Sequence, residues 1–215
     1  MRKGGKLLGS ALIGVGLLLM AAALFLTTRF QREAQEAGDS AAAVADALEA
    51  VISESLDANL GQLSPVLSLE QEYAAQMQIY PEMPTTQIDN YSYIGLISVP
   101  SQGIELPVMD IWDYTRLKVA PCRYSGSYFS NDLVICGHNY PHHFSPLKSV
   151  EVGADVYFTT VDGQIYHYTV IELETLKRYD VDILIDNSTG WDLTLFTCHN
   201  GGGTRCVVRC ARVEE

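Results

Sequence analysis

The chain has 215 residues and a formal net charge of −12, from 14 Lys and Arg against 26 Asp and Glu. Five of the basic residues and none of the acidic ones precede position 33, which leaves 9 basic against 26 acidic groups in residues 33–215, a balance of −17. Nucleic-acid binding requires a basic surface, and an anionic membrane surface repels so acidic a region. Both are therefore excluded as partners of residues 33–215.

The first predicted element is a transmembrane helix. Residues Leu7 to Leu26 form twenty positions without a formal charge, and at ~1.5 Å per residue they span about the ~30 Å of a bilayer core. Arg2, Lys3 and Lys6 precede this run, so the positive-inside rule places the N-terminus in the cytoplasm and the remainder outside. The alternative is a cleaved signal peptide, but the run is longer than the ~7–15 apolar residues of such peptides. We therefore predict a cytoplasmic tip and a retained membrane anchor in residues 1–32.

An acidic stalk and linker is predicted in residues 33–90, where eleven Asp or Glu occur without any Lys or Arg. A helix is expected in its first half, because apolar residues recur there every three or four positions, at Val44, Leu48, Val51, Ile52 and Leu56. This narrow stripe has two interpretations. Either the helix lies on its own domain, or it self-associates as a stalk.

From Tyr91 onward the pattern changes to short β-strands. Asp162-Gly163 lies between two alternating segments and is a strong hairpin signal. Helical patterns are scarce beyond this point, so we predict an all-β barrel or sandwich in residues 91–215. The expected strands are YIGLISV, IELPVM, DLVIC, the two halves of ADVYFTTVDGQIYHYTVIEL, LTLFT and RCVVRCARV.

A reactive cysteine is predicted where two of these strands face each other across a glycine loop. Cys198 ends one strand and Arg205 begins the next, with Gly201, Gly202 and Gly203 between them. Alternation along the second strand places Arg205, Val207 and Arg209 on one face and Cys206, Val208 and Cys210 on the core face. A thiol is nucleophilic as the thiolate, which a nearby His⁺ or Arg favours. We therefore expect Cys198 and Arg205 to share one groove, with Arg209 as a rival that otherwise serves as a surface or substrate-rim charge.

His138 is the candidate acid/base partner among the five histidines. It directly follows a buried strand in LVICGH, as Cys198 follows LTLFT. His167 lies inside a hairpin strand, and His142 and His143 lie in a Pro-containing loop. For these three we expect a surface role.

These residues together resemble the sortases, the cysteine transpeptidases of Gram-positive cell surfaces. The resemblance rests on TLFTC at Thr194 to Cys198, on TRCVVR with Arg205, on Gly137-His138 sixty residues earlier, and on YIGLISVPSQGIELPV upstream. It implies an eight-stranded β-barrel with short helices as the catalytic domain in residues 91–215. It further implies Cys198 as nucleophile, His138 as acid/base, Arg205 as oxyanion stabiliser and Thr197 in the oxyanion hole or substrate placement. The motifs do not assign a subclass.

The implied reaction is the cleavage of an LPxTG-like sorting signal through a thioacyl-enzyme. The implied acceptor is an amine of a peptidoglycan precursor or a pilin, and no cofactor is implied. Two other functions remain open: a cysteine peptidase that releases the acyl group to water, and a non-enzymatic adhesion or scaffold domain.

The five cysteines leave two structural alternatives. One is a disulfide, for which Cys122 with Cys136 is a conceivable pair outside the cell. The other is a zinc site, which strand alternation disfavours because it scatters the four candidate ligands, Cys198, His199, Cys206 and Cys210. The acidic surface leaves a calcium site open, but no spacing of ligands specifies one, so no metal-ligating residues are assigned.

Overall fold

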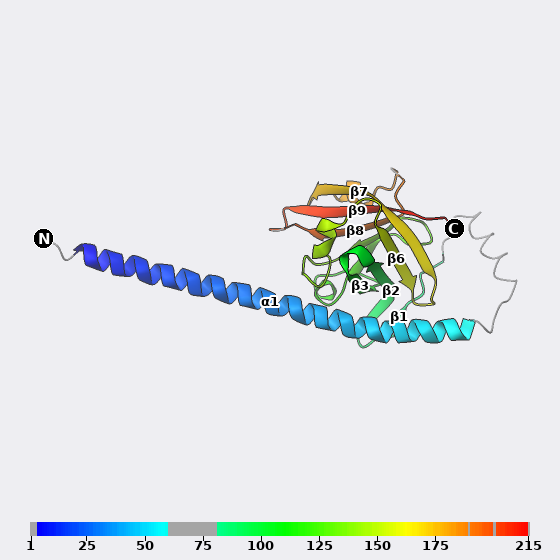
Figure 1. Cartoon of the computed structure of the whole chain (residues 1–215), viewed down its shortest axis with the longest axis horizontal. Coiled ribbons are helices and arrows are strands. Elements are labelled where there is room, and N and C mark those ends of the chain that lie inside the picture. Colours follow the sequence, from blue (N-terminus) through cyan, green and yellow to red (C-terminus); the bar gives the residue numbers. More distant parts are fainter. Residues whose placement is uncertain (1–3, 60–80, 189, 200, 215) are drawn as a thin grey trace. The chain divides into compact units, whose positions relative to one another are not determined.

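The computed structural model describes residues 4–59, 81–188, 190–199 and 201–214. The chain divides into two compact units, Met1–Glu36 and Ala37–Glu215, and helix α1 (Gly4–Asn59) runs through both (Figure 1). Within the described residues, one helical stretch in Ile13–Asp57 is long and apolar enough to cross a membrane, a test that a signal sequence also passes. The predicted anchor therefore has a helix of suitable length and composition.

The second half of α1 packs on its own domain. Ala41, Ala45, Leu48 and Ile52 are buried in the same clusters as the side chains of the β-strands. Alanines at intervals of four, followed by the larger Leu48 and Ile52, form the buried face of this part of the helix. Of the two interpretations of the apolar stripe, the helix on its own domain is confirmed. Residues 37–59 thus contribute to the core, and the functional division at residue 91 stays a prediction.

Nine strands follow among the described residues. Three short 3₁₀ helices and the one-turn helix α3 lie in the connections; they are η1 (Pro100–Gln102), η2 (Arg116–Lys118), η3 (Ser145–Ser149) and α3 (Val181–Ile185). The strands are β1 (Thr86–Ile88), β2 (Tyr91–Val99), β3 (Ile104–Met109), β4 (Cys122–Ser125), β5 (Leu133–Cys136), β6 (Asp155–Thr160), β7 (Ile165–Lys177), β8 (Leu193–Cys198) and β9 (Thr204–Arg212).

The sheet closes into a barrel, as predicted. Its order is β1-β2-β3-β4-β5-β8-β9-β7-β6, and β6 pairs again with β2. Eight strands therefore form the closed barrel, and β1 pairs only with the first three residues of β2, from Tyr91 to Tyr93. Two neighbours are parallel, β3 with β4 and β5 with β8. Gly95 permits the closure, since its φ is +155° and a Cβ there would lie 2.1 Å from the Thr159 carbonyl oxygen of β6.

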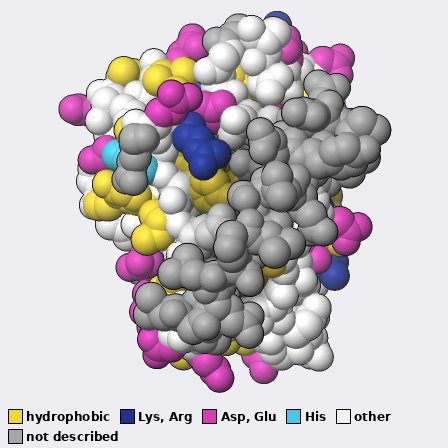
Figure 2. All heavy atoms as spheres, turned by 90° about the vertical axis from the view of Figure 1, so that its right-hand side faces the viewer, with side chains coloured by type: hydrophobic (Ala, Val, Ile, Leu, Met, Phe, Trp, Pro, Cys, Tyr) yellow, Lys and Arg dark blue, Asp and Glu magenta, His cyan; other side chains and the backbone are white. Residues whose placement is uncertain are grey.

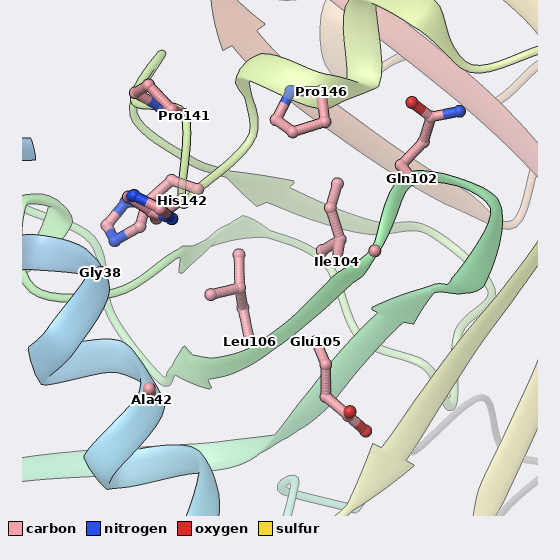
Figure 3. A pocket seen from close by; sticks show the side chains of 11 residues that line it. Gly38, Ala42, Gln102, Ile104, Glu105, Leu106, Pro141, His142 and Pro146 are labelled. Atoms are coloured by element: carbon pink, nitrogen blue, oxygen red, sulfur yellow. The ribbon is translucent and has the colours of Figure 1, made fainter. Parts of the chain in front are cut away.

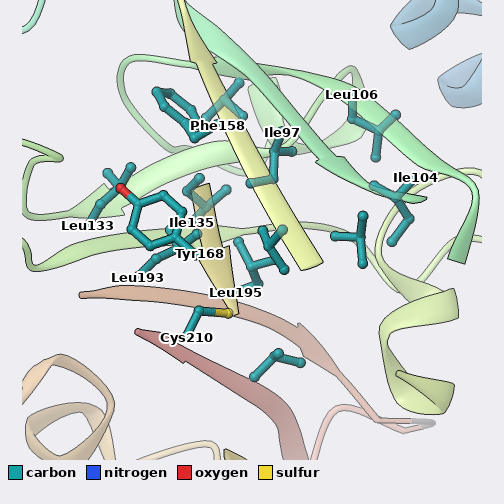
Figure 4. Close-up of a cluster of buried hydrophobic side chains, with 14 of the residues drawn as sticks. Ile97, Ile104, Leu106, Leu133, Ile135, Phe158, Tyr168, Leu193, Leu195 and Cys210 are labelled. Carbon is teal, nitrogen blue, oxygen red and sulfur yellow. The ribbon is translucent and has the colours of Figure 1, made fainter. Parts of the chain in front are cut away.

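The barrel interior is a continuous apolar core (Figure 4). Alternate residues of every long strand point into it, as the period of two requires. On β8 these are Leu193 and Leu195, whereas Phe196 belongs to a second buried cluster together with Val207. The two faces of β8 thus have separate environments. The outer face carries the candidate site.

Candidate active site

Cys198 and Arg205 lie directly opposite each other. They are the last Cα partners of the antiparallel pair β8–β9. Beyond them the amide of His199 donates to the carbonyl oxygen of Thr204 at 2.9 Å, and Gly201 and Gly202 turn the chain with φ of 84° and 69°. Cys198 is exposed and Arg205 is half-buried. The glycine loop therefore holds the thiol and the guanidinium at the same end of the two strands, as predicted.

His138 reaches the same end because β5 runs parallel to β8. Cys136 is the Cα partner of Phe196, and the amide of Gly137 donates to the carbonyl oxygen of Phe196 at 3.0 Å. His138 follows Cys136 by two residues, as Cys198 follows Phe196. His138, Cys198 and Arg205 therefore form one row across three adjacent strand ends.

Cys198 and Arg205 share the outer face of the barrel, and His138 lies just beyond the neighbouring strand end. Cys136, Phe196 and Val207 each stand two residues from a member of the row, and all three belong to the second cluster, outside the barrel core. Because side chains two residues apart point to the same side of a strand, the thiol and the guanidinium project on that side, and His138 follows the end of β5 next to them. The row can hold a peptide carbonyl between a nucleophile and a cationic donor.

Arg205 has an unused hydrogen-bond donor. Its Cζ lies 5.1 Å from the centre of the Phe196 ring, a cation–π contact. Its buried Nη1 has no hydrogen-bond partner within the described part of the chain. A buried N–H without a partner is costly, and a developing oxyanion at this position would satisfy it. Phe196 was missed as a supporting residue, although its place two residues before Cys198 indicated the shared face.

The ring of His138 is held by packing. It stacks on Tyr140 with 4.6 Å between ring centres and 28° between planes. Burial, with a smaller effect of the Lys118 charge, lowers the pKa of His138 below its usual value. Its buried Nε2 has no hydrogen-bond partner in the described segments. The imidazole is thus mostly neutral at pH 7, and no sequence signal predicted the contact with Tyr140 or Lys118.

Arg209 has a different role from the one expected. It is 2% exposed, so its interpretation as a surface or substrate-rim charge is wrong. Its Nη1 donates to the carbonyl oxygen of Leu184 at 2.7 Å and to Thr194 Oγ1 at 2.8 Å. Its Nη2 donates to the carbonyl oxygen of Ile183 at 2.8 Å, and its Nε to Glu174 Oε1 at 3.2 Å.

These partners occupy the guanidinium of Arg209, which also lies 4.8 Å from the centre of the Trp191 ring. Two of the accepting carbonyls come from α3, which the arginine ties to strands β7 and β8. Arg205, with its free donor, is therefore the better candidate for the oxyanion, as the sequence comparison of the two arginines favoured.

Thr197 lies on the inner face of β8. It is 1% exposed, and its Oγ1 donates to the carbonyl oxygen of Gly137 at 2.9 Å. Direct contact with substrate stays a prediction. The hydrogen bond supports an indirect contribution, because it ties the strand of Cys198 to the turn that carries His138.

The remaining cysteines are core residues. Cys206 and Cys210 are buried, as predicted from alternation. Cys122 and Cys136 are Cα partners on β4 and β5, both buried, and all five cysteines are free thiols. Across the described residues, no three His, Cys, Asp or Glu side chains are close enough to hold a metal ion.

Two histidines of the 141–143 loop differ from each other. His142 is exposed, whereas His143 is 1% exposed, so the expected surface role is wrong for His143. His167 pairs with Asp155, with 2.8 Å between Nε2 and Oδ1, on the rim of the β6–β7 hairpin. The burial of His143 depends on α1, and local sequence pattern does not show that contact.

The comparisons with known proteins all match members of one protein family. A family model described as the sortase domain matches residues 97–213. A sortase A of Streptococcus agalactiae is 27% identical over 144 residues, which are 60% of this chain and 56% of that protein. The chain thus spans little more than half the length of this relative.

Solved structures agree in fold. Sortase A of Listeria monocytogenes is 25% identical with a TM-score of 0.51, covering 57% of this chain and 88% of that one. Sortase C of Streptococcus pneumoniae is 22% identical with a TM-score of 0.54, covering 77% and 97%. The second likeness concerns the fold alone.

Proposed function

The chain belongs to the sortase family of cysteine transpeptidases, and from this premise we propose that it cleaves an LPxTG-like sorting signal and joins the product to an amine. The observation that carries the proposal is the row of His138, Cys198 and Arg205 across β5, β8 and β9. The acceptor is an amine of a peptidoglycan precursor or a pilin.

The reaction has two halves. The Cys198 thiolate attacks the threonine carbonyl of the signal, and Arg205 donates to the oxyanion that forms. His138, as imidazolium, protonates the departing amine, which leaves a thioester between Sγ and the threonine carbonyl. The acceptor amine then attacks the thioester and gives its proton to His138, and Cys198 leaves as thiolate.

The negative net charge of the domain favours an amine as the acceptor. Residues 33–215 carry a balance of −17, and acidic side chains are spread over the face shown in Figure 2. An acidic surface raises the local concentration of cations, and a free amine is mostly protonated at neutral pH, so the acceptor arrives as a cation and loses one proton to solvent before it attacks. The same field disfavours anionic acceptors.

Product analysis with and without an added amine tests the function. Incubated with a sorting-signal peptide and a short amine-bearing peptide, the full chain in detergent is expected to yield the ligated product. A cysteine peptidase would release only the hydrolysed acid, at a rate that the amine does not change. That second outcome would replace transpeptidation by hydrolysis.

Arg205→Lys keeps the charge and is expected to lower kcat/KM about 10²-fold, since one lost oxyanion donor costs about that much and lysine lacks the planar fork. Arg212→Lys is the matched control. Arg212 lies at the other end of β9, where it is exposed, and the rate is expected to remain unchanged. Equal rates for wild type and Arg205→Lys would remove Arg205 from the mechanism.

We place the catalytic unit outside the cytoplasm, anchored by the apolar helix near the N-terminus. The basic residues ahead of the apolar run support this orientation. Protease added to intact protoplasts is expected to digest residues 37–215. Complete protection, with digestion only after lysis, would reverse the topology.

A further inference from the structure

The loop after His138 folds back on itself. The amide of Phe144 donates to the carbonyl oxygen of His138 at 3.1 Å, and the amide of His143 to that of Tyr140 at 3.0 Å. Phe144 is fully buried, and its ring lies against Gly137, where a Cβ would come within 2.5 Å of it. The loop 138–144 is therefore a compact turn, and a shift of one part is transmitted to the rest.

Tyr140 connects two histidines of this turn. Its ring stacks on His138, and its centre lies 5.6 Å from that of His143. His138 Nε2 makes no hydrogen bond within the described chain, so the stack with Tyr140 is a main restraint on its ring. Tyr140 thus contacts the rings of both His138 and His143.

His143 contacts helix α1. Its Nε2 lies 3.4 Å from the carbonyl oxygen of Ala37, and the hydrogen bond forms when Nε2 carries the proton. Burial lowers the pKa of His143 to about 4, so the ring is neutral at physiological pH. The ring of His143 is neutral and fully buried, so its contact with the helix carbonyl has a structural role.

Helix α1 approaches the loop 138–144 at Gly38. A Cβ on Gly38 would lie 2.7 Å from Cβ and 2.9 Å from Cγ of His142. Both atoms are close to the loop backbone, so rotation of a side-chain tip cannot relieve the clash. Figure 3 shows Gly38 of α1 beside His142, at the margin of a hollow lined also by Ala42 and Pro141.

We propose that α1 is part of the active-site scaffold, with Gly38 and His143 as positioning residues that seat the loop 138–144 and thereby orient the ring of His138. The contact sequence runs from Ala37 to His143, to Tyr140 and to His138. The importance of that ring rests on the proposed function. The coupling itself rests only on these contacts.

The first test follows the His138 ring directly by NMR of the full chain in detergent micelles, with ¹³C,¹⁵N-labelled histidine and assignment by His138→Gln. Gly38→Ala and His143→Leu are expected to shift or broaden the His138 ring signals. His143→Gln, which keeps an N–H donor for the Ala37 carbonyl, is expected to restore them. Gly16→Ala is the matched control, because it makes the same change in α1 where a Cβ meets nothing within 4 Å.

The second test is kinetic. Gly38→Ala is expected to lower kcat about tenfold or more, because small misplacements of a catalytic group are costly, while KM stays within about twofold. A purely structural loss would lower the fraction of active protein and leave the kcat per titrated Cys198 thiol unchanged. The kcat is therefore expressed per thiol.

The outcomes separate this inference from the proposed function. His138 signals that are identical in wild type, Gly38→Ala and His143→Leu would overturn the coupling, even if the peptide is cleaved normally. Shifted signals in a protein that processes no peptide would support the coupling and count against the function. If His143→Leu does not fold, Gly38→Ala tests the same loop from the helix side.

Discussion

Cys198→Ala is expected to abolish thioacyl formation, and His138→Ala to reduce kcat/KM about 10²- to 10⁴-fold, the usual contribution of a general acid or base. The first removes the only atom that bonds to the substrate. The second removes the acid for the departing amine. Neither change replaces an internal contact of the barrel core, so both variants are expected to fold.

The pH dependence follows from how the two groups share protons. A free thiol has a pKa of ~8.5 and a free imidazole ~6.5, and burial lowers the pKa of His138 further. The imidazolium is therefore lost as pH rises through that lowered pKa, while the thiolate is gained as pH rises. Only the fraction of the enzyme that holds the thiolate and the imidazolium together is active. A plot of kcat/KM against pH is therefore expected to be bell-shaped. Its two apparent pKa values describe the coupled pair and not either residue alone.

Peptide cleavage between about pH 5 and 10, followed in wild type and variants, checks this expectation. Cys206→Ala and His167→Ala are controls, since Cys206 is buried and His167 lies on the distant β6–β7 hairpin. Both variants are expected to retain the bell-shaped pH profile of kcat/KM. A His138→Ala variant with unchanged rate and profile would remove the imidazole from the reaction.

Arg209→Met is expected to lower the free energy of unfolding by about 3 kcal/mol, because it leaves buried acceptors and the partly exposed carboxylate of Glu174 without their donor. The change leaves the carbonyls of Ile183 and Leu184 and the hydroxyl of Thr194 without their donor. The methionine fills similar volume, so the loss is chiefly polar.

Urea unfolding of the full chain in detergent measures this effect. Arg212→Met, an exposed arginine on the same strand, is the control, with an expected change below about 1 kcal/mol. If Arg209→Met were as stable as the control, its contacts with α3 would not hold that segment.

Local pattern predicted the parts of the site that depend on alternation and on strand ends. The face shared by Arg205 and Val207, and the inward cysteines 206 and 210, follow from the period of two. The nearness of His138 to Cys198 followed from their matching places after two buried strands. The parallel pairing of β5 with β8, which brings the two strand ends side by side, is a non-local contact that the sequence did not predict.

The parts that sequence did not show depend on contacts distant in the chain. Strand β4 is four residues long and carries no clear pattern. Arg209 resembles a surface residue until the carbonyls of α3 are placed beside it. His143 looks like a loop histidine until Ala37 of α1 covers it, about a hundred positions earlier.

In the proposed mechanism, Cys198 forms a thioester with the threonine of a sorting signal. Intact-mass spectrometry of the full chain, quenched in acid during turnover of an LPxTG-like peptide, tests it most directly. We expect an added mass equal to the peptide up to threonine less one water, which maps to Cys198 and is removed by hydroxylamine. Absence of an adduct across a library of such peptides, or an adduct that persists in Cys198→Ala, would contradict it.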